Sequence, residues 1–373
     1  MINESDTELA NKTLSLPPAP PSSSSTSSLN KISGSSFNSP ANQNDSSSTT
    51  QDNNDPFNGL SFRVGVAENK NTIYRNKMED VHTYIANFAE RVDWGYFAIF
   101  DGHAGKDTAR WCGNNLHSIL EQDIDDEHED MNPAPPVGKY DIRTNLCRTF
   151  VKADELIAKE GAGSSGCTAA VAVLRWETDD DEEEEKEGTK QAKEGEENEN
   201  KPVENDEKKK QFDFVKKVNH KRMLYTSNVG DSRIVLSRRG KPYRLSYDHK
   251  ATDLNEMNRI RDSGGLIMKN RVNGVLAVTR SLGDSYMKDL VIGKPFTTAT
   301  EVTPDDEYII LACDGVWDVI SDSKACSLVT ELFSKGYDAH GAAKKLCQLA
   351  MDNSTTDNVT VMIVKFDKDV FNL

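Results

Sequence analysis

Two apolar runs in this sequence end in the same pair of residues, an aspartate followed by a glycine. The run Tyr96–Phe100 leads into Asp101-Gly102, and the run Tyr308–Cys313 leads into Asp314-Gly315. A buried strand that ends in a carboxylate places a fixed negative charge at the edge of a sheet, and the glycine beside it lets a ligand or a backbone carbonyl come close. One such pair alone is usually an ordinary turn, so its meaning depends on the acids that accompany it.

Further acids border other apolar runs. Asp357 precedes the run Val359–Val364, and Glu79 and Asp80 precede the run that begins at Val81. Antiparallel neighbours can bring such strand ends together, and clustered carboxylates raise each other's pKa unless a cation is present. Ligand sets made only of oxygen, with no His or Cys at suitable spacing, select Mg²⁺ or Mn²⁺. The acids therefore predict a site for two such ions, which would polarise a phosphoryl oxygen and generate hydroxide near neutral pH.

The elements that position these acids are strands alternating with amphipathic helices. Apolar and alternating runs predict strands at 62–68, 81–87, 96–100, 167–176, 222–228, 233–237, 308–313 and 358–366. Helical spacing predicts helices at about 105–121, 140–160, 253–263, 323–334 and 339–351. The turn Gly230-Asp231 is typical of a hairpin between two of the strands. Because hairpin-like pairs dominate, we expect an α+β fold with antiparallel sheets rather than a doubly wound sheet.

Two segments have compositions that cannot build a core. Residues 1–58 are rich in Ser, Asn, Pro and Thr, and residues 177–210 contain 16 acidic and 7 basic side chains. Such segments bury too little apolar surface to offset the entropy of ordering them. We expect a disordered N-terminal tail at 1–58 and one folded domain at 59–373. That domain carries a disordered charged insertion at 177–219, inside a hairpin connection.

The net charge of −16 lies mostly in the same two segments. Residues 177–210 contribute −9 and residues 1–58 contribute −4, which leaves −3 for the rest of the chain. The folded part is therefore close to balanced. An acidic chain of this kind is a poor candidate for binding nucleic acid or an anionic membrane.

The cysteines and the N-terminus indicate a reducing compartment. The six cysteines are scattered, with no C-x-x-C pair and no zinc spacing, and several lie inside apolar runs, as free buried thiols do. The N-terminus has Glu4, Asp6 and Glu8 and no apolar stretch, so it is not a secretory signal. No run approaches the length of a membrane span. We expect the protein in the cytoplasm and nucleus.

Eight short motifs follow one another along the chain. They are Arg75-Asn76-Lys77-Met78-Glu79-Asp80, Phe100-Asp101-Gly102-His103-Ala104-Gly105, Ser165-Gly166-Cys167-Thr168-Ala169, Val229-Gly230-Asp231-Ser232-Arg233, Arg271-Val272-Asn273-Gly274, Leu276–Asp284, Ala312–Asp318 and Thr356-Asp357-Asn358-Val359-Thr360. Each motif is modest by itself, but the ordered series is specific and covers nearly all of 59–367 outside the charged insertion. In this order the motifs resemble those of the type 2C (PPM) metal-dependent serine/threonine protein phosphatases. The resemblance extends to the small fungal members that oppose stress-responsive MAP kinase signalling.

The resemblance implies a fold and a set of metal ligands. The fold would be a central β-sandwich of two antiparallel sheets flanked by helices, a four-layer αββα arrangement with the metals at one end. Asp101 would bridge both ions, the carbonyl of Gly102 would bind one of them, and Asp314 and Asp357 would complete the second site. Glu79 and Asp80 would act near the metals, partly through water. Asp231 resembles a residue that the family uses for a third, weaker ion.

The resemblance also implies two residues that act on the substrate. Arg75 would bind the substrate phosphate, since its forked donors suit two phosphate oxygens. His103, without context, could be an ordinary hydrogen-bonded side chain. Next to a phosphate held by metals, its imidazole is well placed to protonate the leaving seryl or threonyl oxygen as a general acid.

Other residues have more than one interpretation. Asp284 could touch a metal, or it could fix the loop that carries Arg280. Trp111 and Trp317 are more typical of a core than of a substrate platform. Pro17–Pro21 contains a P-x-x-P spacing that could dock an SH3-type adaptor. Because no basic residue flanks that spacing, a disordered spacer is favoured.

Three functions remain open to these residues. The first, which we favour, is hydrolysis of phosphoserine and phosphothreonine on proteins, in a monomer that acts as a negative regulator of stress-activated MAP kinase signalling. The second is a catalytically dead relative that only binds partners, although Asp101, Asp314 and Asp357 are all present. The third is a metal-dependent nuclease or small-phosphate hydrolase, and the acidic charge balance disfavours the nuclease. The sequence counts against a cysteine-dependent tyrosine phosphatase, because none of the six cysteines has an arginine six positions later.

Overall fold

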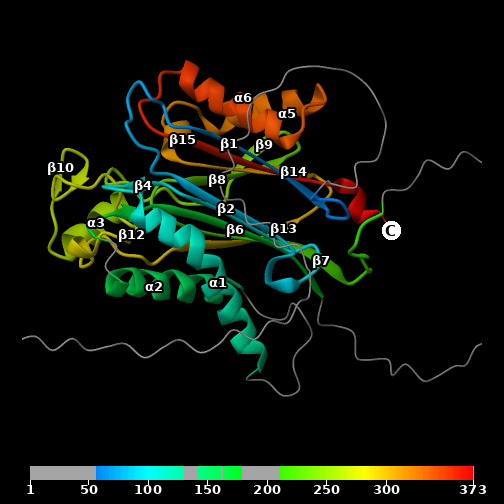
Figure 1. The fold of residues 1–373 in the computed structure, drawn as a ribbon, viewed down its shortest axis with the longest axis horizontal. Coiled ribbons are helices and arrows are strands. Elements are labelled where there is room, and N and C mark those ends of the chain that lie inside the picture. The colour runs from blue at the N-terminus through cyan, green and yellow to red at the C-terminus, as the bar shows by residue number, and fades with distance from the viewer. Residues whose placement is uncertain (1–55, 130–141, 161–162, 179–210, 373) are drawn as a thin grey trace, which may run out of the picture. The chain divides into compact units, whose positions relative to one another are not determined.

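Two antiparallel sheets of five strands each form the centre of the fold, which a computed structural model describes for residues 56–129, 142–160, 163–178 and 211–372 (Figure 1). The first sheet has the order β1 (Phe62–Asn69), β15 (Val359–Phe366), β14 (Asp306–Ala312), β8 (Arg233–Arg238) and β9 (Lys241–Arg244). The second has the order β13 (Phe296–Val302), β7 (His220–Val229), β6 (Ala169–Thr178), β3 (Gly95–Phe100) and β2 (Val81–Ala86).

Alternate residues of the strands fill different cores. In β3, Phe97 and Ile99 lie between the two sheets, whereas Tyr96, Ala98 and Phe100 face the helices. Successive side chains of a strand point to opposite faces, so a strand that is covered on both sides must be apolar throughout. This explains why the run Tyr96–Phe100 shows no polar position.

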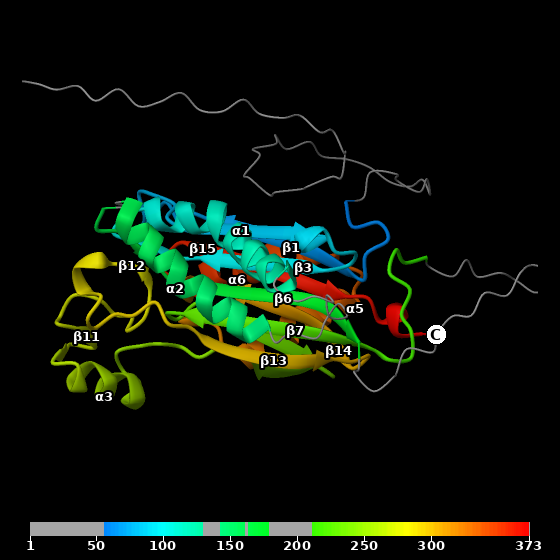
Figure 2. The same ribbon diagram turned by 90° about the horizontal axis from the view of Figure 1, so that it is seen from below.

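Helices cover the outer face of each sheet (Figures 1 and 2). α1 (Asp107–Glu129) and α2 (Ile142–Glu160) share a core with β3, β6 and β7 of the second sheet. α5 (Asp322–Ser334) and α6 (Ala339–Asp352) share a core with β14 and β15 of the first. Ser321 and Asp338 cap α5 and α6 by accepting hydrogen bonds from backbone N–H groups of the first turns. The predicted α+β fold, a four-layer αββα sandwich, is confirmed.

Shorter elements surround one end of the sandwich. α3 (Leu254–Asp262), β10 (Ile267–Met268), β11 (Arg271–Val272) and the 3₁₀ turn η2 (Ser285–Met287) enclose a small core of their own. A three-stranded sheet has the order β12 (Leu282–Gly283), β5 (Gly166–Cys167) and β4 (Gly102–His103). The remaining elements are α4 (Asp314–Trp317), η1 (Phe88–Glu90) and η3 (Lys368–Phe371).

The Gly230-Asp231 turn is not a hairpin, so that prediction is wrong. β7 pairs with β6 and β13, whereas β8 pairs with β9 and β14, so the turn carries the chain from one sheet to the other. The turn residues fix a local reversal, but the packing of two sheets decides which strands pair. The prediction that the charged segment interrupts a hairpin is confirmed, because β6 and β7 are antiparallel neighbours.

The edges of the two segments of biased composition belong to the packed part. Phe57 is buried between the sheets, Glu177 and Thr178 end β6, and Phe214 stacks on Trp176 with ring centroids 4.7 Å apart. The predicted boundaries at 58 and at 177–219 therefore include residues that pack on the domain. Residues 1–55, 130–141, 161–162, 179–210 and 373 lie outside the described residues, and so does the P-x-x-P spacing. Among the described residues, no helix combines the length and apolar character needed to cross a membrane.

Candidate metal centre and active site

The ends of four strands bring the predicted acids together. Val81 of β2 pairs with Phe100 of β3, so Asp80 and Asp101 stand side by side at the end of the second sheet. Ala312 of β14 pairs with Val361 of β15 in the first sheet, so Asp314 and Asp357 follow and precede neighbouring strands. The Thr360 hydroxyl donates a 2.6 Å hydrogen bond to Asp80 Oδ2 and thereby joins the two pairs of acids.

Burial and mutual repulsion make it costly for the carboxyl groups of this cluster to be ionised together. Burial raises the pKa of Asp101 well above its usual range, and the charges of Asp80 and Asp314 raise it further. Burial likewise raises the pKa of Asp314, followed by the charges of Asp231 and Asp357. Burial raises the pKa of Asp80 to about 6, although hydrogen bonds from Thr360 and Cys313 oppose the shift. Buried carboxylates in such numbers require a cation if all are to be ionised at neutral pH.

The donor set fits a hard divalent cation. Asp314 Oδ1 is buried and has no hydrogen-bond partner within the described part of the chain, so one oxygen is left available to a ligand. Oxygens of Asp80 and Asp101 and the Cys313 sulfur lie within 4.8 Å of one another. Burial raises the pKa of the Cys313 thiol well above its usual range. The thiol therefore stays protonated, and carboxylate oxygens are left as the ligands, as Mg²⁺ and Mn²⁺ prefer.

The two Asp-Gly pairs share a structural reason for their glycine. A Cβ on Gly102 would lie 2.6 Å from the backbone oxygen of Glu79, and a Cβ on Gly315 would overlap the backbone oxygen of Asn358. Each glycine therefore allows one acid-bearing strand end to approach the next. The sequence indicated that a ligand or a backbone carbonyl comes close to each glycine. In the structure a backbone carbonyl from a neighbouring strand end lies against each of them.

Arg75 and Glu79 lie on the loop that leads into Asp80. Arg75 donates through Nη2 to Asp357 Oδ2 at 2.5 Å and through Nε to the Thr356 carbonyl at 3.1 Å. Its side chain is 44% exposed, so the guanidinium faces solvent beside the acids. Glu79 is half-buried, and its backbone N–H donates to Asn358 Oδ1 at 2.9 Å.

Asp231 lies at a separate corner of the cluster and has a cationic partner. Lys250 Nζ lies 3.4 Å from Asp231 Oδ2 and 2.7 Å from Asp318 Oδ1. Burial raises the pKa of Asp231, and Lys250 partly offsets this shift. Asp231 is therefore near Asp314 but already shares one positive charge with Asp318.

His103 is held by an acid from another motif. Its Nε2 lies 2.7 Å from Asp284 Oδ2, and the Asp284 side chain is fully buried. Of the two interpretations of Asp284, the hydrogen bonds agree with the second, because Ser281, which donates to Asp284 Oδ2, directly follows Arg280 on that loop. Asp284 Oδ1, like Asp314 Oδ1, is buried without a hydrogen-bond partner in the described part of the chain, so a metal contact stays a prediction. Both of its known side-chain contacts are to the same oxygen, from His103 and from the Ser281 hydroxyl at 2.5 Å.

Asn358 and Lys250 were not singled out in the sequence, and Asp284 was singled out without its partner. Asn358 fixes the Arg75 loop, Lys250 bridges two acids, and Asp284 holds His103. Asn358 and Asp284 lie inside the recognised motifs, which is the only signal that could have pointed to them. Asp284 is 181 positions from His103, and Asn358 is 279 positions from Glu79 on the Arg75 loop. No local pattern therefore predicts these contacts.

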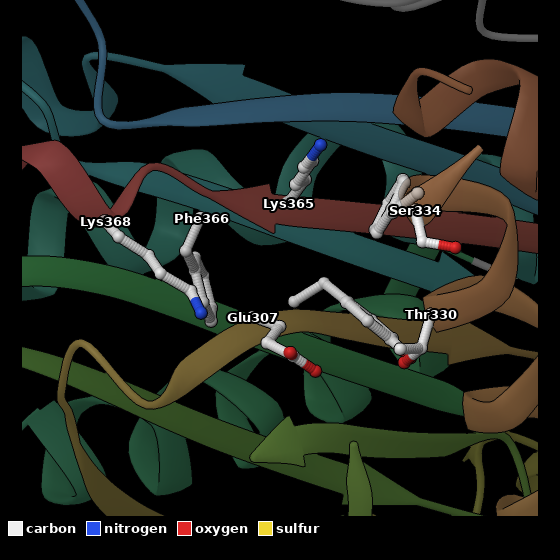
Figure 3. Close-up of a pocket in the computed structure, with 8 residues that line it drawn as sticks. Glu307, Thr330, Ser334, Lys365, Phe366 and Lys368 are labelled. Carbon is white, nitrogen blue, oxygen red and sulfur yellow. The ribbon is translucent and has the colours of Figure 1, made fainter. Parts of the chain in front are cut away.

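A pocket elsewhere in the fold is separate from this cluster. It has a volume of about 240 Å³ and lies near the start of β14 and the end of β15, beside α5 (Figure 3). The acids follow the end of β14 and precede the start of β15, so the pocket is at the opposite end of both strands. Its labelled lining residues are Glu307, Thr330, Ser334, Lys365, Phe366 and Lys368.

Comparisons with known proteins agree with the motifs and the fold. A family model described as protein phosphatase 2C matches residues 64–179 and 179–359. A Saccharomyces cerevisiae protein named protein phosphatase 2C homolog 1 is 49% identical over 306 residues, which cover 82% of this chain and 94% of that protein. A Schizosaccharomyces pombe protein of the same name is 36% identical over 319 residues, which cover 85% of this chain and 77% of that protein.

A solved structure shows the same fold at lower identity. It is described as a phosphatase from a pathogenic strain of Toxoplasma gondii and superposes with a TM-score of 0.61. The match covers 83% of this chain and 94% of that one at 21% identity. At that identity the likeness concerns the fold alone.

Proposed function

The chain belongs to the protein phosphatase 2C family of metal-dependent serine/threonine phosphatases, and from that premise we propose how its own residues perform the reaction. We propose that it hydrolyses phosphoserine and phosphothreonine on proteins at the strand-end carboxylates, with two Mg²⁺ or Mn²⁺ ions. The observation that carries this proposal is the buried acid cluster, in which Asp314 Oδ1 has no partner among the described residues.

The ions would be held by the acids that the strand ends deliver. Asp101, on which the charges of the other acids act, would bind both ions, with the Gly102 carbonyl on one and with Asp314 and Asp357 on the other. Glu79 and Asp80 would act from the adjoining loop, partly through water. When bound, the ions supply positive charge to the phosphoryl oxygens and to the attacking water. We further propose Asp231 for a third, weaker ion, which would compete with Lys250.

Arg75 would bind the phosphoryl group. Its Nη2 and Nε donate to Asp357 and to the Thr356 carbonyl, and Nη1 donates no hydrogen bond within the described ranges. The guanidinium is thus fixed in orientation while one donor face points to solvent. A fixed fork of donors suits two phosphoryl oxygens.

His103 would act as the general acid. The water oxygen forms a bond to phosphorus, and the bond between phosphorus and the seryl or threonyl oxygen breaks with its electron pair on that oxygen. His103 donates a proton to the leaving oxygen and later regains one from solvent, while the water's proton is lost to solvent. The products are the free hydroxyl side chain and inorganic phosphate. Proton donation of this kind contributes roughly 10²–10⁴-fold to a rate.

The deciding experiment measures phosphate release from a phosphothreonine peptide with Mn²⁺ or Mg²⁺, and then with excess chelator. We expect activity with either ion and none after chelation. Asp101→Asn should lower kcat by at least about 100-fold, because the site would lose several kcal/mol of charge stabilisation. Asp125→Asn removes one exposed acid, whose ion pair in the described part of the chain is with Arg91, and is the matched control. Turnover that survives chelation or Asp101→Asn would overturn the two-ion mechanism.

The physiological role is a separate proposal. We propose that the chain is a monomer in the cytoplasm and nucleus that opposes stress-activated MAP kinase signalling, with phosphorylated members of that cascade as substrates. The motif series, which resembles the small fungal members, and the 49% identity to a yeast relative support it. Deleting the gene should prolong threonine phosphorylation of the stress-activated kinase after stress. An unchanged time course would contradict this role.

An adaptor interaction through the N-terminal Pro17–Pro21 segment is the least supported proposal. Its only basis is the P-x-x-P spacing, which lacks a flanking basic residue. Binding of a peptide of this segment to SH3 domains, measured by calorimetry, would test it. Absence of binding at millimolar peptide would exclude it.

A further inference from the structure

The contact between His103 and Asp284 is the best-defined interaction in the site that the proposed mechanism does not use. Nε2 and Oδ2 are 2.7 Å apart, the Asp284 side chain is 0% exposed and the His103 side chain is 26% exposed. Among the described residues, neither lysine nor arginine forms an ion pair with Asp284, so the imidazole is its counterpart. A buried carboxylate beside one nitrogen of an imidazole fixes the orientation and the tautomer of the ring.

Resting on the proposed general-acid role of His103, we propose that Asp284 is a positioning residue for it. Asp284 accepts the Nε2–H of His103, so that Nδ1 is the nitrogen that delivers the proton to the leaving oxygen. Nδ1 has no hydrogen-bond partner within the described part of the chain. When Nδ1 has donated its proton, the neutral ring keeps Nε2–H on Asp284 and remains in place for the next turnover.

A dedicated three-stranded sheet holds the two side chains in register. Gly166 of β5 pairs with His103 of β4 on one side and with Gly283 of β12 on the other. Asp284 follows directly after β12. In this sheet Gly166 therefore lies between His103 and the end of the strand that leads into Asp284. This arrangement connects three motifs that are far apart in the sequence.

Gly166 keeps the space between the two side chains open. A Cβ at this position would overlap both Asp284 Oδ2 and His103 Nε2. Any other residue at 166 would therefore force the pair apart. The glycine has an ordinary backbone conformation here, so close packing against the pair is the reason for it.

Asp284 itself is fixed from several directions. Its backbone N–H donates to the Ser165 carbonyl at 3.1 Å, and the Ser281 hydroxyl donates to Oδ2 at 2.5 Å. Asp284 is the left-handed residue that starts η2, with φ of 47°. From the opposite side, Asp154 accepts from the Gly283 N–H at 3.0 Å and pairs with Lys288 at 2.8 Å. Asp154 therefore anchors the same turn without touching His103.

The kinetic test compares Asp284→Asn, His103→Ala and their double variant in the full chain with Mn²⁺. A phosphothreonine peptide has a poor leaving group that needs a proton, whereas p-nitrophenyl phosphate releases a phenolate that does not. We expect Asp284→Asn to lower kcat on the peptide by about 10–100-fold, with KM unchanged and p-nitrophenyl phosphate turnover nearly unchanged. The double variant should be no slower on the peptide than His103→Ala alone, because both changes remove one function.

Asp154→Asn is the matched control, and we expect it to leave the ratio of the two substrates unchanged. Equal losses on both substrates in Asp284→Asn, or losses that multiply in the double variant, would overturn the proposal. The same holds if Asp154→Asn changes the ratio as much as Asp284→Asn does, because Asp284 would then only hold the turn.

A spectroscopic test does not depend on activity. Long-range ¹H–¹⁵N spectra of histidine-labelled protein, with His103 assigned from His103→Ala, should show the proton on Nε2 in the wild type. Asp284→Asn should shift the ring toward a mixture of tautomers. If the wild type hydrolyses neither substrate with Mn²⁺ or Mg²⁺, the proposed function fails. In that case this spectrum alone tests the contact between His103 and Asp284. A wild-type ring with its proton on Nδ1 would overturn the proposal.

Discussion

Asn358 shows how one buried side chain sets the geometry of the substrate-binding loop. Its Nδ2 donates to the carbonyls of Lys70 and Lys77 at 2.8 and 3.0 Å, and its Oδ1 accepts from the Glu79 N–H. All three hydrogen bonds of the amide go to the loop that carries Arg75. Asn358 is next to Asp357. One residue therefore holds the Arg75 loop, and its neighbour is a proposed metal ligand.

We predict that Asn358→Ala destabilises the protein and weakens substrate binding. It leaves three backbone groups without their partner, and each buried group left unpaired costs about 1–3 kcal/mol unless water replaces it. We expect the free energy of unfolding, measured with urea, to fall by at least about 2 kcal/mol. The KM for phosphopeptide should rise by about tenfold. Asn353→Ala, which removes one exposed hydrogen bond to Val319, is the control. A KM equal to that of the control would show that Asn358 does not position Arg75.

At the scale of elements, the segment 248–251 joins the sandwich to the small region around α3. The His249 N–H and its Nδ1 both bond to the Gly230 carbonyl, at 2.9 and 3.2 Å. The His249 carbonyl accepts from the Thr279 N–H, and the Ala251 N–H donates to the Ala277 carbonyl. Nδ1 must donate to a carbonyl, and Nε2 is buried without a hydrogen-bond partner among the described residues, so His249 fits this place only as a neutral ring.

We predict that His249 makes folding stability fall as the pH is lowered. Burial, and then the charge of Arg280, lowers the pKa of His249 from 6.5 to about 4. Between these values the unfolded chain binds the proton and the folded chain does not. Protonation therefore favours unfolding, by up to about 3 kcal/mol at the lower end.

His249→Asn keeps a donor near the position of Nδ1 but does not titrate. Urea unfolding of both proteins from neutral pH down to about 4 should give a flatter dependence for the variant. Parallel curves for the two proteins would mean that His249 contributes nothing to the acid sensitivity.

At the scale of the whole molecule, the acid cluster joins the ends of both sheets, so its charge affects the stability of the entire sandwich. The folded-state pKa of Asp80 is raised from 3.8 to about 6, and those of Asp101 and Asp314 are raised well above their usual range. In the metal-free protein the folded state binds these protons more tightly than the unfolded chain. The free energy of unfolding therefore falls as the pH rises above 3.8, and the part of this fall that comes from Asp80 is complete above about 6.

We predict that Mg²⁺ or Mn²⁺ raises the melting temperature, and raises it most at neutral pH. An ion at 100 times its Kd adds about 2.7 kcal/mol, which corresponds to about 5–10 °C for a domain of this size. Thermal unfolding with ion or with chelator, at neutral pH and below about 5, measures the effect. Asp101→Asn should reduce the shift strongly. A shift that is the same at both pH values, or that survives in the variant, would contradict the assignment.

Most elements of the fold could be predicted because local patterns carry them. The strand expected at 96–100 is β3 at Gly95–Phe100, and the helix expected at 339–351 is α6 at Ala339–Asp352, since both patterns are strongly apolar or periodic. β13, Phe296–Val302, was missed. It is a half-exposed edge strand rich in threonine, and its alternation is weak.

The sequence alone determined which residues could bind metal and which family the chain resembles. Each acid stands at the end of an apolar run, and strand burial is encoded locally by the types of the neighbouring residues. Only the tertiary structure decided that the two sheets, and not a hairpin at Gly230, bring those ends together. It also paired Asp284 with His103 and Asn358 with the Arg75 loop. Such contacts depend on distances between residues that are far apart in the chain, and these distances exist only once both sheets have packed.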